Sequence, residues 1–193
     1  MRMRFKPYAR PELAAWDNFI DKPALLRGKW NTAFAKNQPL RVEMGCGKGG
    51  FLAGQALRQP NCNYLGVDIK SEMLVVAKRT IEKHFAEAGK QPDNILLTAH
   101  NIEQLDAILA PEDVAQRIYI NFCNPWYKSG YAKHRLTHPR QLIRYRSFLQ
   151  PDGAIYFKTD DSPLFEDSLR YFELAGFEVA WLTSNLHAEE PAW

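Results

Sequence analysis

From residue 40 onward, the chain alternates between short β-type segments and longer segments whose apolar residues recur at helical spacing. The predicted strands cover residues 40–45, 63–68, 94–99, 117–122, 153–159 and 177–183. The predicted helices cover residues 51–59, 71–89, 103–109, 138–150 and 162–176. Strands that alternate with helices in this way predict an α/β fold with a doubly wound, mostly parallel sheet and helices on both faces.

The 193 residues are 46% hydrophobic, which is enough to build one domain with a proper core. No repeat, low-complexity tract or linker interrupts them. We therefore expect a single domain over 1–193. Within it, 1–39 forms a basic arm with short helical or irregular lead-in segments, and 40–193 forms the core.

Composition excludes several classes of protein. No apolar run approaches the ~20 residues of a membrane span, so we expect no membrane partner. The three cysteines, Cys46, Cys62 and Cys123, are odd in number and lack metal-site spacing, which favours reduced thiols in a cytoplasmic protein without a metal. The net charge is only +3, so a polyanionic partner must be bound by local clusters of basic residues.

Polar residues follow four successive predicted strands. Glu43 precedes a glycine-rich turn that includes Gly45 and Gly47, and Asp68 ends the second strand. Asn101 follows the third strand and Asn124 the fourth. Each residue alone is commonly a turn or surface residue, but ligands in such sheets bind at the carboxyl ends of the strands. Together they predict a cofactor site.

The glycine turn also satisfies the dinucleotide-binding spacing, Gly45-x-Gly47-x-x-Gly50 with Asp68 further on. That reading predicts an oxidoreductase whose loop cradles a pyrophosphate. Glu43 argues against it, because a carboxylate beside the loop repels phosphates. S-adenosylmethionine suits the residues better, since it offers an adenine, a ribose diol, a sulfonium and an ammonium that a carboxylate can bind.

Four segments carry a resemblance to a known family. They are VEMGCGKGGFL (42–52), YLGVDIKSEML (64–74), NFCNPWYKSGYAKHRLTHP (121–139) and FKTDD (157–161). In order and spacing they resemble the tRNA (guanine-N(7)-)-methyltransferase family, from the N-terminal arm to about residue 187. The resemblance implies a Rossmann-like class I methyltransferase that moves the methyl group of S-adenosylmethionine to N7 of a guanine in the tRNA variable loop.

The resemblance also implies roles for individual residues. Glu43, Asp68, Asn101 and Asn124 match the family's cofactor contacts, while the glycine turn accounts for Gly45 and Gly47. Lys128 and Asp160 match the family's substrate-binding residues.

The chain departs from the family in three places. Asn124 and Asn101 stand where the family usually has Asp, and the family's Thr-x-x-Glu motif and last strand have no counterpart before Trp193. We therefore expect a core that is C-terminally truncated relative to the family and lacks the last strand. Sheet edges exposed by that loss favour self-association.

The chemistry of N7 methylation explains the candidate catalytic residues, Asn124 and Asp160. Guanine N7 carries no proton, so its lone pair can attack the sulfonium methyl without a general base. The purine gains positive charge as it is alkylated, which a carboxylate stabilises and an amide dipole stabilises less. We expect slower transfer than in a relative with Asp at position 124.

A basic and aromatic block follows the fourth predicted strand. Its cations are expected to neutralise tRNA phosphates, and its rings to offer faces for an unstacked base. The cations are Lys128, Lys133, Arg135 and Arg140, and the rings are Trp126, Tyr127 and Tyr131.

Two alternatives remain open from the residues. An amino-group methyltransferase acting on adenine N6 or glutamine carries Asn-Pro-Pro-aromatic after the fourth strand, whereas Asn124-Pro125-Trp126 lacks the second proline. A non-catalytic RNA-binding or scaffold protein that keeps the fold is the second alternative.

Overall fold

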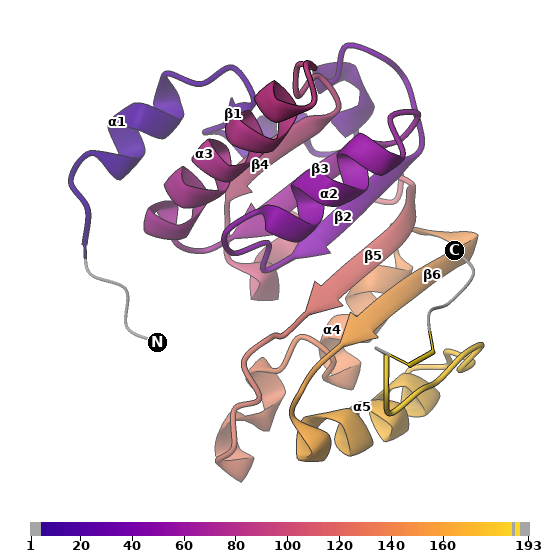
Figure 1. The fold of residues 1–193 in the computed structure, drawn as a ribbon. Coiled ribbons are helices and arrows are strands. Elements are labelled where there is room, and N and C mark those ends of the chain that lie inside the picture. The colour runs from indigo at the N-terminus through magenta and orange to yellow at the C-terminus, as the bar shows by residue number, and fades with distance from the viewer. Residues whose placement is uncertain (1–4, 187, 190–193) are drawn as a thin grey trace.

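The computed structural model describes residues 5–186 and 188–189, and in these residues the strands form one parallel sheet of six strands. The order across the sheet is β1-β4-β3-β2-β5-β6 (Figure 1). The strands are β1 (Phe19–Ile20), β2 (Leu40–Met44), β3 (Asn63–Asp68), β4 (Ile95–Ala99), β5 (Ala115–Asn121) and β6 (Leu149–Lys158). The strand order reverses at β2, which places the predicted ligand site at the carboxyl ends of β2 and β5.

Helices cover both faces of the sheet, and the predicted α/β fold is confirmed. One face packs against α1 (Ala9–Ala14), α2 (Gly50–Arg58) and α3 (Ser71–Glu87). The other face packs against three short 3-10 segments and two helices: η1 (Pro23–Leu26), η2 (Trp30–Ala33), η3 (Ile102–Ala107), α4 (Pro139–Arg146) and α5 (Ser162–Leu174). A fourth 3-10 segment, η4 (Ser129–His134), lies in the loop after β5.

The lead-in segment is anchored in the core by one buried carboxylate. Asp113 accepts hydrogen bonds from the backbone N–H groups of Gly28 (2.6 Å), Trp30 (2.9 Å) and Ala110 (2.9 Å). The fully buried Trp30 indole also donates to the Ile108 carbonyl at 2.7 Å. Because these donors are satisfied internally, the lead-in packs as part of the sheet's cover.

The turn between β2 and α2 depends on close packing at one glycine. Gly49 caps α2 with a left-handed φ of 73°, and a Cβ added there would lie 2.9 Å from the Ala77 Cβ on α3. A side chain at this position would separate α2 from α3. Glycine therefore lets the two helices pack closely beside the site.

Three helix starts or extents differ from the sequence expectation. The 103–109 region forms a short 3-10 segment rather than an α-helix, and α4 ends at Arg146 because the chain already enters β6 at Leu149. Asp161, not Ser162, caps α5 by accepting a hydrogen bond from the Leu164 N–H at 2.8 Å.

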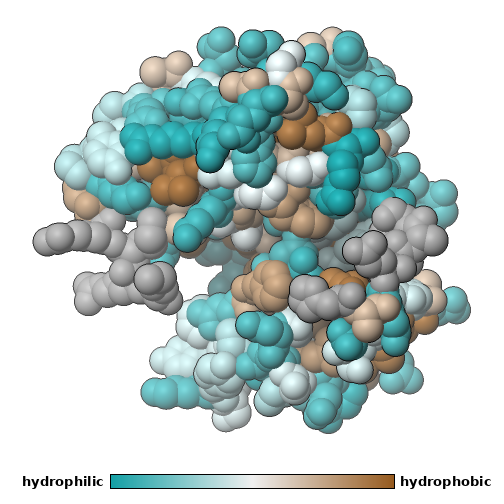
Figure 2. Space-filling view, viewed as in Figure 1, coloured by the Kyte–Doolittle hydropathy of each residue, from teal (hydrophilic) through white to brown (hydrophobic). Residues whose placement is uncertain are grey.

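The predicted strand 177–183 is wrong, because these residues form neither strand nor helix. A strand needs a hydrogen-bonded neighbour, and in the described residues β6 pairs only with β5. Val179 and Leu182 of the segment stay exposed, at 50% each, while Phe177 packs against the core. Hydrophobic residues also reach the surface in the lower half of Figure 2, the region where β6 and α5 lie in Figure 1.

Candidate active site

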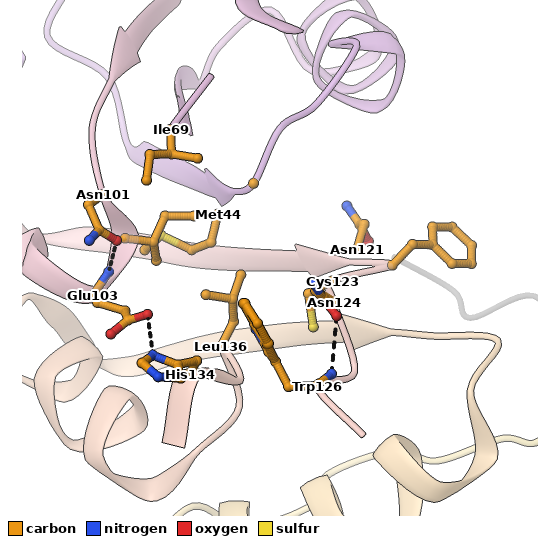
Figure 3. A pocket seen from close by; sticks show the side chains of 13 residues that line it. Met44, Ile69, Asn101, Glu103, Asn121, Cys123, Asn124, Trp126, His134 and Leu136 are labelled. Atoms are coloured by element: carbon orange, nitrogen blue, oxygen red, sulfur yellow. Dashed lines mark hydrogen bonds and ion pairs between the residues drawn. The ribbon is translucent and has the colours of Figure 1, made fainter. Parts of the chain in front are cut away.

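A pocket of about 320 Å³ opens where β2, β4 and β5 end (Figure 3). Its walls come from the turns after these strands and from the loop that leads to α4. The lining residues are Met44, Gly45, Ile69, Asn101, Ile102, Glu103, Asn121, Phe122, Cys123, Asn124, Trp126, His134 and Leu136. Three of the predicted site residues, Gly45, Asn101 and Asn124, are therefore in its wall.

Glu43 lies behind the pocket wall with one carboxylate oxygen unsatisfied. The side chain is 3% exposed, and its Oε1 accepts a hydrogen bond from Asn121 Nδ2 at 3.0 Å. Its buried Oε2 has no partner among the described residues. An orphaned buried carboxylate oxygen is costly unless a ligand satisfies it. This oxygen is suited to the ammonium of the expected methyl donor.

Burial raises the pKa of Glu43 to about 8, although the Asn121 hydrogen bond and the charge of Lys158 act in the opposite direction. The negative charge of Asp68 adds to the upward shift. Glu43 and Asp68 therefore share one electrostatic environment at the ends of β2 and β3. A cationic ligand between them would be attracted by both.

Asp68 ties the glycine turn to the end of β3. Its Oδ2 accepts from the Gly47 N–H at 3.1 Å, and its Oδ1 accepts from the Lys70 N–H at 2.9 Å. Each carboxylate oxygen keeps a further lone pair, so the same group can also accept from a ribose diol. Gly45 and Gly47 have φ values of 75° and 53°, and an added Cβ would meet nothing closer than 3.8 Å. The glycines thus leave the loop surface open to a ligand.

Asn101 and Asn124 each use their side-chain oxygen to hold a turn. Asn101 Oδ1 accepts from the Glu103 N–H at 3.0 Å and caps η3. Asn124 Oδ1 accepts from the Trp126 N–H at 3.1 Å (Figure 3). An amide that accepts through oxygen still has two N–H donors. Both side chains can therefore serve their turns and a ligand together.

The turn that carries Asn124 is strained. Phe122 has a φ of 49° and Trp126 a φ of 46°. They are the two residues other than glycine with a positive φ in the described part of the chain. Such conformations cost about 1–3 kcal/mol each and cluster at functional sites. These two strained residues lie on either side of Asn124, a predicted site residue.

Lys128 and Asp160 lie outside the pocket lining. Lys128 directly precedes η4, and Asp160 is exposed beyond the end of β6. Their sequence neighbours nevertheless touch, since the Tyr127 hydroxyl donates to Asp161 Oδ2 at 2.8 Å. The two predicted substrate residues thus flank one bond between the β5 and β6 loops, at the edge of the site.

The expectation that Arg135 neutralises tRNA phosphates is wrong. Arg135 is 7% exposed, and its Nε donates to the Pro125 carbonyl at 2.7 Å. Its guanidinium also pairs with Asp167 of α5 at 2.6 Å. This arginine holds the turn beside Asn124 against α5, and a run of charges in the sequence does not distinguish such a residue from surface cations.

The structure adds site residues that sequence reasoning did not identify. Asn121 binds Glu43 and lines the pocket, and its place at the end of a predicted strand was the signal available for it. Glu103 Oε1 and His134 Nδ1 lie 2.7 Å apart and join the loop after β4 to the loop after β5 (Figure 3). That pairing spans 31 positions and left no local signal in the sequence.

The described residues contain neither a candidate metal site nor a helix able to cross a membrane. Across residues 5–186 and 188–189, no group of three or more His, Cys, Asp or Glu side chains is placed to hold a metal ion. In the same part of the chain, no helix has the length and apolar character needed to cross a bilayer.

The parallel sheet, the strand reversal at β2 and the strand-end pocket define a doubly wound α/β fold of the kind found in class I methyltransferases. Solved structures agree on the fold. A precorrin-6y C5,15-methyltransferase from Geobacter metallireducens aligns with a TM-score of 0.54 at 14% identity, covering 72% of this chain and 62% of that one. An antibiotic-related methyltransferase aligns with a TM-score of 0.52 at 19% identity, covering 74% and 70%.

Sequence comparison gives the family. Residues 37–191 match the family model Methyltransf_4, described as "Putative methyltransferase". The tRNA (guanine-N(7)-)-methyltransferase of Clostridium beijerinckii is 51% identical over 97% of this chain and 85% of its own length. That of Ruminiclostridium cellulolyticum is 53% identical over 97% and 80%. The chain belongs to the tRNA (guanine-N(7)-)-methyltransferase family, which confirms the resemblance seen in its motifs.

Proposed function

We propose that this chain transfers the methyl group of S-adenosylmethionine to N7 of a guanine in the variable loop of tRNA. Its relatives are named for this reaction over nearly the whole chain. The structural observation that carries the proposal is the buried Glu43 carboxylate with its unsatisfied Oε2 at the end of β2. A phosphate-free, positively charged methyl donor satisfies that oxygen, whereas a dinucleotide does not.

The residues at the strand ends fit the parts of the donor. Glu43 accepts from the ammonium, Asp68 accepts from the ribose diol, and the Asn101 amide meets the adenine edge. Gly45 and Gly47 let the donor approach the backbone of the turn. When bound, S-adenosylmethionine supplies an electrophilic methyl group on a sulfonium, and the chain's own residues align it.

The transfer itself needs no proton to be removed by the protein. Guanine N7 is a bare acceptor on the base edge, so its lone pair attacks the methyl carbon in line with the sulfur leaving group. Asn124, whose Oδ1 is held by the Trp126 N–H, offers its amide N–H groups to an acceptor on the base. Asp160 supplies negative charge toward the purine as positive charge develops on it.

The exposed cations of the β5 loop bind the RNA backbone in this proposal. Lys128, Lys133 and Arg140 lie outside the buried ion-pair network, on the segment that borders the pocket. Trp126 and Tyr131 stack with ring centroids 5.9 Å apart and provide an aromatic surface for a base taken out of its stack. Salt should therefore weaken tRNA binding steeply.

A labelled-methyl assay on bulk tRNA, followed by nucleoside analysis, tests the proposal. We expect the label in 7-methylguanosine, dependent on S-adenosylmethionine. Label in N6-methyladenosine or in a glutamine amide would instead indicate the amino-group methyltransferase. Binding of tRNA without any transfer would indicate the non-catalytic RNA-binding protein.

Two further proposals concern partners and compartment. The outer edge of β6 has no strand partner in the described residues, which favours pairing between copies of the chain. Sedimentation should then show a dimer or larger species, and a concentration-independent monomer would contradict it. The free cysteines and the tRNA substrate support a cytoplasmic location, which cell fractionation can test.

A further inference from the structure

A lysine that the proposed reaction has not used lies at the edge of the donor site. Lys158 is the last residue of β6 and is the register partner of Asn121 on β5. Asn121 in turn binds Glu43 on β2. The register partner of Glu43 on β5 is Tyr119, two residues before Asn121. Residues two apart on a strand and residues paired across strands point to the same face, so the three side chains share one face near the strand ends.

Two aromatic rings hold the Lys158 ammonium in place. Its Nζ lies 5.0 Å from the ring centroid of Phe122 and 5.8 Å from that of Phe51. Phe51 is in the first turn of α2, and the backbone N–H of Phe122 donates to the Lys158 carbonyl at 2.8 Å. A cation between two ring faces is favourably placed without an acidic partner.

Among the described residues, no carboxylate lies within ion-pair distance of this ammonium. The positive charge of Lys158 favours the ionised form of Glu43. This face of the sheet therefore presents a carboxylate with a free oxygen and, nearby, a cation without an acidic partner among the described residues. A zwitterion matches this arrangement better than a simple cation or anion does.

We propose that Lys158 binds the carboxylate of the donor's amino-acid tail, while Glu43 binds the ammonium of the same tail. This inference rests on S-adenosylmethionine being the methyl donor. It makes Lys158 a positioning residue, because it fixes the tail and thereby the direction of the sulfonium. It also explains why a lysine is kept between Phe51 and Phe122 with its hydrogen-bond donors unused.

Calorimetry with two ligands tests the inference without tRNA. S-adenosylhomocysteine carries the amino-acid tail, whereas 5′-methylthioadenosine has the same nucleoside without it. For Lys158→Met we expect the Kd of S-adenosylhomocysteine to rise roughly 10- to 100-fold, since a hydrogen bond to a charged group is lost. The Kd of 5′-methylthioadenosine should stay within about twofold, which also shows that the variant is folded.

Two control variants complete the design. Lys158→Arg retains the cation and should recover most of the affinity for S-adenosylhomocysteine. Lys90→Met removes an exposed lysine beyond the far end of α3 and should leave the Kd of both ligands unchanged. Equal losses for both ligands in Lys158→Met, or no loss for either, would overturn the inference.

The outcomes separate this inference from the proposed function. If the unaltered chain binds neither S-adenosylmethionine nor S-adenosylhomocysteine, the proposed function fails. If it binds both and Lys158→Met lowers only tRNA affinity, the proposed function stands, and Lys158 contacts phosphate rather than the donor tail.

Discussion

The donor half of the site and the substrate half are built differently. At the ends of β2 and β3, Glu43 and Asp68 are fixed by hydrogen bonds from Asn121 and from the glycine turn. At the ends of β5 and β6, Lys128 and Asp160 lie on loops outside the pocket. We propose from this difference that the donor site is formed before tRNA arrives, whereas the substrate site is completed by the RNA.

One residue anchors the substrate half to the helix that follows β6. Arg135 links the Pro125 carbonyl beside Asn124 to Asp167 on α5, and it does so from a buried position. The base of the substrate loop is therefore fixed to the core. Variants that affect one half and spare the other are the means to test this comparison.

The largest effect is expected from Arg135→Met. Removing the guanidinium leaves the Pro125 carbonyl unpaired and Asp167 with Arg170 as its remaining partner, which should lower the free energy of unfolding by about 2–4 kcal/mol. Urea titration followed by circular dichroism measures the change. Arg140→Met removes an exposed arginine of α4 and is the matched control. Equal stability of the two variants would show that Arg135 does not anchor the loop.

The next effect is expected from Glu43→Gln, which keeps the shape of the side chain but cannot ionise when the ligand's ammonium binds. We expect the Kd of S-adenosylhomocysteine to rise about 100-fold, because the ligand's ammonium loses a buried partner. Calorimetry measures this loss. Glu87→Gln alters an exposed residue at the end of α3, and its Kd for S-adenosylhomocysteine should equal that of the unaltered chain. Unchanged binding by Glu43→Gln would mean that the donor half is assigned wrongly.

The same variant carries a pH prediction with a definite sign. The pKa of Glu43 is raised from 4.5 to about 8, so the folded chain holds this proton more tightly than the unfolded chain. The associated stability is present below pH 4.5 and is lost as the pH rises through 8. Without ligand, the free energy of unfolding of Glu43→Gln should therefore be higher than that of the unaltered chain by about 2–4 kcal/mol at pH 9. The two free energies should be equal near pH 4.5. A constant difference across this range would contradict the prediction.

A smaller effect is expected from Asn124→Asp in the turn between the two halves. A carboxylate stabilises the charge that develops on the purine better than an amide dipole, so the single-turnover rate should rise about tenfold. Rapid quench with labelled donor measures the rate, and Asn61→Asp on an exposed turn is the control. A lower rate in Asn124→Asp would contradict this electrostatic role.

The smallest effect is expected from Lys128→Ala in the substrate half. Losing one phosphate contact should raise the KM for tRNA several-fold and lower the salt slope of binding by about 1, with donor affinity unchanged. Filter binding at several salt concentrations measures the slope. Lys90→Ala is the control. A loss of donor affinity in Lys128→Ala would contradict the assignment of Lys128 to the substrate half alone.

Much of the fold could be predicted from local pattern. The strand 63–68 was placed at its observed bounds, because a continuous apolar run bounded by polar residues indicates a buried parallel strand. The segment 177–183 has a similar pattern and forms no strand. Strand formation depends on a neighbour in the sheet, and that information is not in the segment itself.

The site shows the same division between local and non-local information. Glu43, Asp68, Asn101 and Asn124 could be predicted as candidates because each lies at, or just beyond, the carboxyl end of a predicted strand. The Asn121 bond to Glu43 spans 78 positions and depends on the order of strands in the sheet. The burial of Arg135 depends on α5 packing against its loop. Contacts of this kind arise only when distant segments meet.

A crystal structure with S-adenosylhomocysteine tests the central claim most directly. The account predicts the ligand in the strand-end pocket, with its ammonium at Glu43 Oε2, its ribose hydroxyls within hydrogen-bond reach of Asp68, and its adenine beside Asn101. A ligand bound elsewhere, or one whose ribose and ammonium contact neither carboxylate, would contradict it.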